Sequence, residues 1–181
     1  MPSVRPSRNR ESFKVTTPIQ PTTPATAPPG PVITKSEVTW RGERLFDAGP
    51  PGRQHRVDAG AKEAPGPVET LLGAIAACSS VDIIDIIAKR KTPVERLSVA
   101  VIAERRPEFP RRIMKLELEY QVEGAGIERE HAERAMTLSF EKYCSVAGSL
   151  ASDIEVHASL TLNGEKGSRV KQTIWSPETN G

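Results

Sequence analysis

The sequence predicts an α+β domain preceded by a disordered arm. Three observations support this: a proline-rich beginning, short segments of alternating polar and apolar residues, and one long apolar segment of helical length. The segments follow the order strands, helix, strands, helices and a last strand, which is typical of an α+β fold. We expect a disordered extension over residues 1–33, a folded domain over 34–163 and a flexible tail over 164–181.

Residues 1–33 lack the composition of a folded domain. They hold eight of the chain's sixteen prolines and one aromatic residue, Phe13. So little apolar surface does not offset the entropy lost on folding, and the prolines favour extended polyproline conformations. The arm carries four basic side chains against Glu11, so the remaining residues net −1 and predict no nucleic-acid surface. A transit peptide is the weaker alternative, because these prolines would break its amphipathic helix.

The domain begins with a predicted antiparallel meander of three short strands. A turn over residues 48–52, rich in glycine and proline, separates the second strand from the third. A loop over 60–66 follows, and Pro67 then stands where helices commonly begin, since its missing N–H is not needed there. The strand segments are residues 37–40, 44–47 and 54–58.

Residues 67–91 predict one long helix that is apolar on most of its sides. A helix of this kind is buried in a core or an interface. Three carboxylates, Glu69, Asp82 and Asp85, interrupt the apolar stretch. Because carboxylates are costly inside a bilayer, we expect a buried helix of a soluble protein and no association with a membrane.

The second half of the domain alternates strands with helices. Residues 96–105 and 112–122 have apolar residues at every second position, which predicts strands with one solvated face. Residues 127–142 predict an amphipathic helix and 144–150 a short second helix. Residues 154–162 again alternate and predict the last strand.

The two cysteines are the candidates for chemistry after other sites are excluded. The three histidines and two cysteines lack a zinc-ligand spacing, and the chain has neither a glycine-rich phosphate loop nor a G-x-S-x-G motif. We therefore expect no metal and no bound cofactor. No secretory signal precedes the domain, so we expect a cytoplasmic protein, in which a disulfide is usually transient and catalytic or redox-sensing. Taken alone, free cysteines are more often small buried side chains.

The segments around both cysteines resemble those of the OsmC/Ohr family. GPVETLLGAIAACSSVDIIDIIAK, residues 66–89, is similar to the family's first cysteine helix with its NPEELLxAAxAAC pattern. EKYCSVAGSL, residues 141–150, is similar to the segment that holds its second cysteine. The resemblance covers residues 34–163. It implies antiparallel sheets wrapped around long central helices in an intertwined homodimer.

The resemblance implies a cysteine-based peroxidase that reduces organic hydroperoxides and hydrogen peroxide. Cys78 would be the peroxidatic thiolate, and Cys144 would resolve its sulfenic acid as a Cys78–Cys144 disulfide. Nearby positive charge favours a thiolate, and condensation with a second thiol prevents higher oxidation. An external thiol, either a dithiol of the lipoyl type or a small thiol, would then reduce the disulfide.

The resemblance also implies an arginine held by a glutamate. Arg56 in HRVDAG matches the arginine best, with Arg53 and Arg44 as lesser candidates and a solvated strand residue as the alternative. The family's glutamate usually lies ten residues before the cysteine, where this chain has Val68. Glu69 lies one residue later, about 100° around the helix. It is interpreted either as the partner of Arg56 or as a favourable anion in the first helical turn.

Two non-catalytic functions remain open. The chain could be a small-molecule-binding protein of the same fold with inert cysteines. It could also be a redox sensor that uses the arm over 1–33 to bind a partner protein. A peroxidase would act as an antioxidant in the stress response. It differs from the binding protein and the redox sensor because only in the peroxidase does Cys78 turn over peroxide.

Overall fold

The structure is a computed structural model that describes residues 30–176. Every helix and strand described below lies within residues 35–181, one of the two units into which the chain divides. The predicted disordered extension lies almost wholly outside the described residues, as do the last five residues of the predicted tail.

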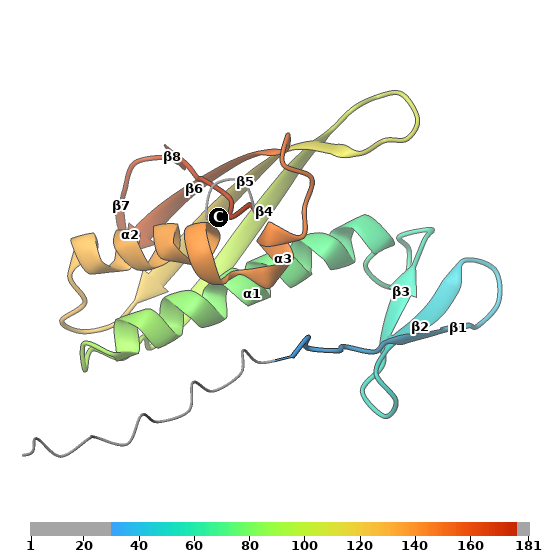
Figure 1. The fold of residues 1–181 in the computed structure, drawn as a ribbon, viewed down its shortest axis with the longest axis horizontal. Coiled ribbons are helices and arrows are strands. Elements are labelled where there is room, and N and C mark those ends of the chain that lie inside the picture. The colour runs from blue at the N-terminus through green and yellow to red at the C-terminus, as the bar shows by residue number, and fades with distance from the viewer. Residues whose placement is uncertain (1–29, 177–181) are drawn as a thin grey trace, which may run out of the picture. The chain divides into compact units, whose positions relative to one another are not determined.

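The predicted meander is present as a three-stranded antiparallel sheet (Figure 1). Its strands are β1 (Glu37–Trp40), β2 (Leu45–Gly49) and β3 (His55–Asp58). Asp58 at the end of β3 is buried, and its carboxylate accepts the backbone N–H groups of Gly60, Lys62 and Glu63 at 2.7, 2.8 and 3.0 Å. These hydrogen bonds hold the pKa of Asp58 below its ordinary value and fix the loop that leads to the first helix.

The long helix α1 (Pro67–Ala88) begins at Pro67, as predicted, and ends three residues earlier than predicted. Its buried residues are Ile75, Ser79, Ile83 and Ile87. They recur every fourth residue, so they form one stripe along the helix. By length and composition, α1 is the one helix among residues 30–176 that could cross a membrane. In this chain the buried stripe belongs to the hydrophobic core of the domain.

A second sheet of five strands provides the other side of the core. Its path is β4-β5-β6-β7, with β8 also paired to β6. The strands are β4 (Arg96–Arg105), β5 (Ile113–Glu123), β6 (Glu155–Leu162), β7 (Glu165–Lys166) and β8 (Val170–Lys171). The expectation of antiparallel sheets is wrong at one place, because β5 and β6 run parallel. The chain between them crosses back through a helical segment, as parallel neighbours require.

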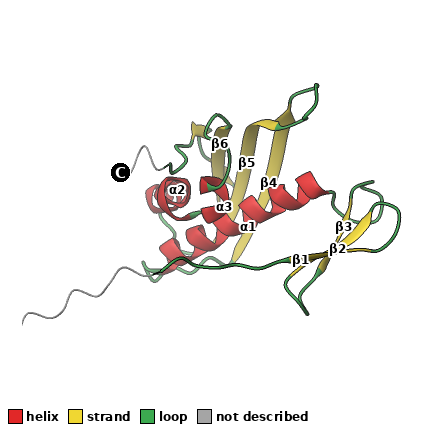
Figure 2. Cartoon of the chain, turned by 45° about the vertical axis from the view of Figure 1, so that its right-hand side comes forward, coloured by secondary structure: helices red, strands yellow, loops and turns green. Residues whose placement is uncertain are grey.

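That crossover consists of α2 (Arg129–Leu138), the π-helix η1 (Ser139–Tyr143) and α3 (Ser145–Gly148). The predicted single helix over 127–142 therefore stops at Leu138, where the backbone widens into a π-turn. The Cys144 N–H donates to the Ser139 carbonyl at 2.8 Å, which spans five residues instead of four. Figure 2 shows α1, α2 and α3 on the same side of the five-stranded sheet.

The chain after β6 differs from the expected flexible tail. β7 and β8 both pair with β6, which would otherwise expose an unpaired edge. Gln172 is buried, and its N–H donates to the Val156 carbonyl at 2.8 Å. Trp175 donates its backbone N–H to the Phe140 carbonyl at 3.0 Å. These residues therefore belong to the folded domain.

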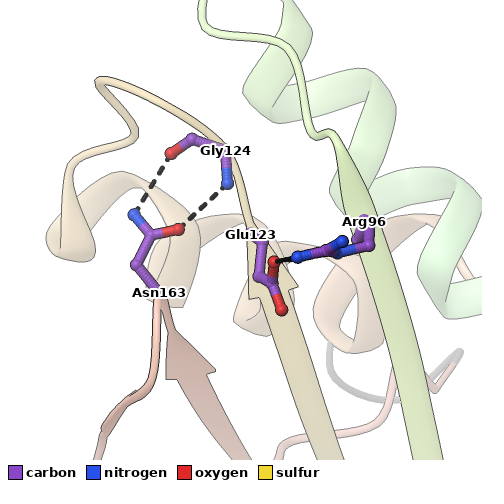
Figure 3. A network of polar contacts seen from close by, with 4 residues as sticks. All are labelled: Arg96, Glu123, Gly124 and Asn163. Atoms are coloured by element: carbon purple, nitrogen blue, oxygen red, sulfur yellow. Dashed lines mark hydrogen bonds and ion pairs between the residues drawn. The ribbon is translucent and has the colours of Figure 1, made fainter.

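Figure 3 shows the contacts that fix one end of the sheet. The Asn163 side chain donates to the Gly124 carbonyl at 3.2 Å and accepts the Gly124 N–H at 3.0 Å. Arg96 on β4 pairs with Glu123 on β5. A Cβ at residue 124 would lie 2.6 Å from the Pro93 carbonyl oxygen, so this close approach requires glycine.

Ile83 tests the packing of α1. We expect Ile83→Ala to lower the free energy of unfolding by about 2–5 kcal/mol, because its side chain is fully buried and its loss leaves a cavity. Ile102 on β4 is 60 % exposed, so Ile102→Ala, the matched control, should change stability by less than about 0.5 kcal/mol. Urea unfolding measures both. Equal losses for the two variants would contradict the packing described.

Candidate functional site

The fold brings the two cysteines together from distant parts of the sequence. Cys78 lies in the middle of α1, and Cys144 is the N-cap residue of α3. Both are free thiols; Cys144 is 4 % exposed, and Cys78 is half-buried against the same hydrophobic cluster. Cys78 lies close enough to Cys144 to raise the pKa of the Cys144 thiol. The structure thus brings together the two cysteines for which the sequence resemblance implies a disulfide, and the pairing itself stays a prediction.

Cys144 is held as a neutral thiol. Burial is the largest influence on its pKa and raises it far above the ordinary value. The Ala147 N–H donates to Cys144 Sγ at 3.4 Å and acts in the opposite direction. Contact with Cys78 and the negative charge of Asp82 raise the pKa further. A thiol in this environment has little thiolate at neutral pH, and the thiolate is the nucleophilic form.

Beneath the cysteine pair lies a buried hydrogen bond that links α1 to the sheet. Ser79 and Tyr120 are both buried, and their hydroxyl oxygens are 2.6 Å apart. The Ser79 hydroxyl is also 2.8 Å from the Ile75 carbonyl. Burial is the main cause that raises the pKa of Tyr120, and the hydrogen bond with Ser79 acts in the opposite direction, while the nearby cysteines and Asp82 raise the pKa further. Tyr120 therefore remains a neutral phenol close to both sulfurs.

Asp82 lies one helical turn after Cys78 on α1 and is fixed by η1. The Ser139 hydroxyl donates to Asp82 Oδ2 at 2.7 Å. The same Ser139 accepts the Cys144 N–H through its backbone carbonyl. Ser139 thus connects the carboxylate to the second cysteine. Sequence reasoning used Asp82 as an argument against a membrane span and assigned it no role at the site.

An open pocket of about 270 Å³ adjoins Cys144. The aromatic side chains of Tyr143 and Trp175 line it. Lys142 Nζ lies 5.4 Å from the centre of the Tyr143 ring. A larger cleft of about 820 Å³ lies between the segments 148–155 and 171–176 and includes neither cysteine. Among residues 30–176, no three His, Cys, Asp or Glu side chains gather as ligands for a metal ion. The remaining lining residues of the smaller pocket are Ser145, Gly148 and Ser149.

Arg56 lies in the three-stranded sheet, where it pairs with a carboxylate other than Glu69. Its Nε is 2.7 Å from Asp47 Oδ1, and Arg41 Nε is 2.6 Å from Asp47 Oδ2. Hydrogen bonds from both arginines hold the pKa of Asp47 below its usual range. The Arg56 side chain is 46 % exposed. The sequence resemblance implies that the Arg56 guanidinium lies beside the Cys78 thiolate. Within one chain, this guanidinium pairs with Asp47 instead.

Glu69 closes the start of α1. Its Oε2 accepts the Gly66 N–H at 2.7 Å, three residues back, which is the acidic half of a capping box. Of its two interpretations, the structure of one chain supports the first-turn anion, and the expected pair with Arg56 is not formed there. The helix begins in this place because Glu69 occupies the third helical position.

Comparisons with known proteins agree with this fold. A family model described as OsmC-like protein matches residues 60–159. Protein YhfA of Escherichia coli (strain K12) is 34 % identical over 115 residues, which are 62 % of this chain and 86 % of that protein. The crystal structure of an OsmC-like protein from Mycoplasma pneumoniae has a TM-score of 0.63 at 15 % identity, over 71 % of this chain and 95 % of that one.

A second similar solved structure belongs to a protein whose name refers to organic hydroperoxide resistance. The organic hydroperoxide resistance protein OsmC from Legionella pneumophila superposes with a TM-score of 0.53 at 16 % identity, over 72 % of this chain and 98 % of that one. At this identity the similarity indicates a common fold.

Glu69 provides a test of the helix cap. Glu69→Ala should lower the free energy of unfolding by about 0.5–1 kcal/mol, because the Gly66 N–H loses its acceptor. Glu69→Gln, the matched control, can still accept this hydrogen bond and should retain most of the stability. Thermal melting followed by circular dichroism compares the two. If both variants lose the same stability, the side chain does not act as this cap.

Proposed function

The chain belongs to the OsmC-like protein family, and from this premise we propose that it is a thiol-dependent peroxidase of organic hydroperoxides. The observation that carries the proposal is the proximity of two free thiols, from α1 and from the N-cap of α3, beside an open pocket with aromatic walls that is lined by Cys144 and not by Cys78. Pockets of this character bind small, partly apolar molecules. The name of the Legionella pneumophila protein, which refers to organic hydroperoxide resistance, is consistent with such a substrate.

The proposed reaction uses each sulfur once. The Cys78 thiolate attacks one peroxide oxygen, the O–O bond breaks, and the alcohol leaves with a proton, so that Cys78 becomes a sulfenic acid. Cys144 Sγ then attacks Cys78 Sγ. The S–S bond forms, the S–O bond breaks, and the sulfenic hydroxyl leaves as water with the Cys144 proton. An external dithiol reduces the disulfide and is itself oxidised to a disulfide.

We also propose that the active protein is an intertwined homodimer, in which Arg56 serves the cysteine pair of the other copy. A thiolate nucleophile needs nearby positive charge, and Arg56 is directed to Asp47 within its own chain. Val38 and Trp40 on β1 are about two-thirds exposed, and Val81 on α1 is 57 % exposed. A two-fold interface would cover such apolar surfaces.

A non-catalytic small-molecule-binding protein is the second candidate. The aromatic pocket beside Cys144 and the burial of that thiol both favour a ligand site with inert sulfur. This alternative predicts binding without thiol consumption, so the same peroxide assay separates the two functions. For either function we expect a cytoplasmic protein.

The peroxidase proposal predicts distinct behaviour for the two cysteines. With cumene hydroperoxide and excess dithiol, Cys78→Ser should abolish turnover. Cys144→Ser should permit one reaction and then accumulate sulfinic acid at Cys78, because no second thiol protects the sulfenic acid. Stopped-flow peroxide consumption and mass spectrometry measure these outcomes. Reduced wild-type protein that loses no thiols within minutes would refute the peroxidase.

Mixed dimers test the role of Arg56. Arg56→Ala should slow peroxide attack by about 100-fold, as removal of a preorganised charge does, and Arg111→Ala, at an exposed arginine between β4 and β5, is the control. Coexpression of Arg56→Ala with Cys78→Ser should restore about a quarter of wild-type activity, because half of the dimers then contain one intact site. Activity no higher than that of Arg56→Ala alone would exclude an arginine supplied by the other copy. Light scattering of the same samples reports the dimer.

A further inference from the structure

The segment after β8 lies beyond the residues that the family model matches, and it is anchored to the domain. The match ends at residue 159, and the chain continues through β7 and β8 into this segment. Gln172 is buried and donates its backbone N–H to the Val156 carbonyl at 2.8 Å. Ile174 packs against the hydrophobic core. The segment therefore offers a fixed surface to its surroundings.

Trp175 is held in place near the end of this segment. Its backbone N–H donates at 3.0 Å to the carbonyl of Phe140 in η1. Its ring lies against the backbone of Gly148, because a Cβ built on Gly148 would be 3.5 Å from Trp175 Cε3. Trp175 is nevertheless 40 % exposed. A ring that is fixed on one side and open on the other can act as the wall of a cavity.

Trp175 stands between two cavities. Gly148 and Trp175 are the two residues that line both the pocket of about 270 Å³ beside Cys144 and the cleft of about 820 Å³. Residues shared by two neighbouring cavities form the wall between them. Gly148 has no side chain, so among residues 30–176 the indole of Trp175 is the side chain that closes this wall.

The pocket beside Cys144 is small when it is closed in this way. One water molecule occupies about 30 Å³ in the liquid, so 270 Å³ holds about nine groups of that size. A branched or aryl hydroperoxide, such as tert-butyl or cumene hydroperoxide, is of this order of size. A long-chain lipid hydroperoxide needs more space, and the adjoining space behind Trp175 is the cleft. The size of the site thus depends on one ring.

We propose that Trp175 is a specificity-determining residue: its indole separates the pocket beside Cys144 from the adjoining cleft and restricts the site to compact organic hydroperoxides. This inference rests on the proposed function and deepens it by naming the class of peroxide. Cys144 forms part of the pocket wall, and Cys78 packs against the cluster that contains Cys144. A molecule in the pocket therefore lies beside the cysteine pair. Trp175 contributes shape and no reacting group.

The first test measures access to Cys144 without peroxide. In a Cys78→Ser background, Cys144 is alkylated by N-ethylmaleimide or by the larger N-(1-pyrenyl)maleimide, and mass spectrometry gives both rates. Trp175→Ala should raise the ratio of the larger to the smaller reagent by about tenfold, the usual scale of size discrimination in an apolar pocket. Thr173→Ala is the matched control, because Thr173 is exposed in the same segment and lines the cleft but not the pocket. Its ratio should not change.

The second test uses the intact cysteine pair and two peroxides. With excess dithiol, Trp175→Ala should raise kcat/KM for a long-chain fatty-acid hydroperoxide, relative to tert-butyl hydroperoxide, by about tenfold. Thr173→Ala should keep the wild-type ratio. If no variant consumes either peroxide, the proposed peroxidase fails while the alkylation ratio still reports on the wall. If the peroxidase is active and both ratios are unchanged in Trp175→Ala, the role of Trp175 alone fails.

Two further outcomes of the alkylation test overturn the role of Trp175. One is an equal rise of the ratio in Thr173→Ala, and the other is no labelling of Cys144 by either maleimide in any variant. Circular dichroism checks the fold of each protein. If alanine is not tolerated at residue 175, Trp175→Leu keeps an apolar side chain on Gly148 but opens part of the wall, so it should shift the ratio in the same direction. Trp175→Phe keeps a ring there and should stay closer to the wild-type ratio.

Discussion

The packing of α1 on the five-stranded sheet is the constraint on which the site depends. Ile75, Ser79, Ile83 and Ile87 recur at four-residue steps and form the buried stripe. Once this stripe is set, the residues one position earlier are set as well, because a step of one residue turns about 100° around the helix. Cys78 and Asp82 are those residues, and they face η1 and the start of α3 through their contacts with Cys144 and Ser139.

Hydrogen bonding makes this arrangement tolerable inside a core. Ser79 and Ser139 are buried polar residues, and each has a side-chain partner, Tyr120 and Asp82. An unpaired hydroxyl at either place would cost about 1–3 kcal/mol, so these pairs also select one relative position of helix, sheet and π-turn. The same contacts that stabilise the fold therefore determine where the sulfurs lie.

Local pattern predicted the elements, and tertiary structure determined the site. Alternation gave β4 and β5 nearly to the residue, and Pro67 marked the start of α1. The π-turn at Ser139 has no sequence period, since it arises where the chain must turn toward Cys144. The partnership of Ser79 with Tyr120, 41 residues apart, depends on packing alone. The strands after residue 164 were missed because two-residue strands carry no alternation to recognise. The contact of the cysteines could be anticipated only through family resemblance.

The charges around the cysteine pair give the two sulfurs unequal environments. Within a single chain, burial and the Asp82 carboxylate oppose the ionisation of Cys144, whereas the Ala147 N–H favours it. Arg56, the cation that the resemblance connects with Cys78, is directed to Asp47 on a separate sheet. Peroxide attack requires a thiolate, whereas protection of a sulfenic acid requires only a nearby thiol. A positive charge brought to Cys78 from outside the chain would therefore activate the first sulfur and leave the second neutral. Association of two chains would then be a condition for reactivity as well as for stability. No rearrangement within one chain would be needed to keep one sulfur a thiolate and the other a neutral thiol.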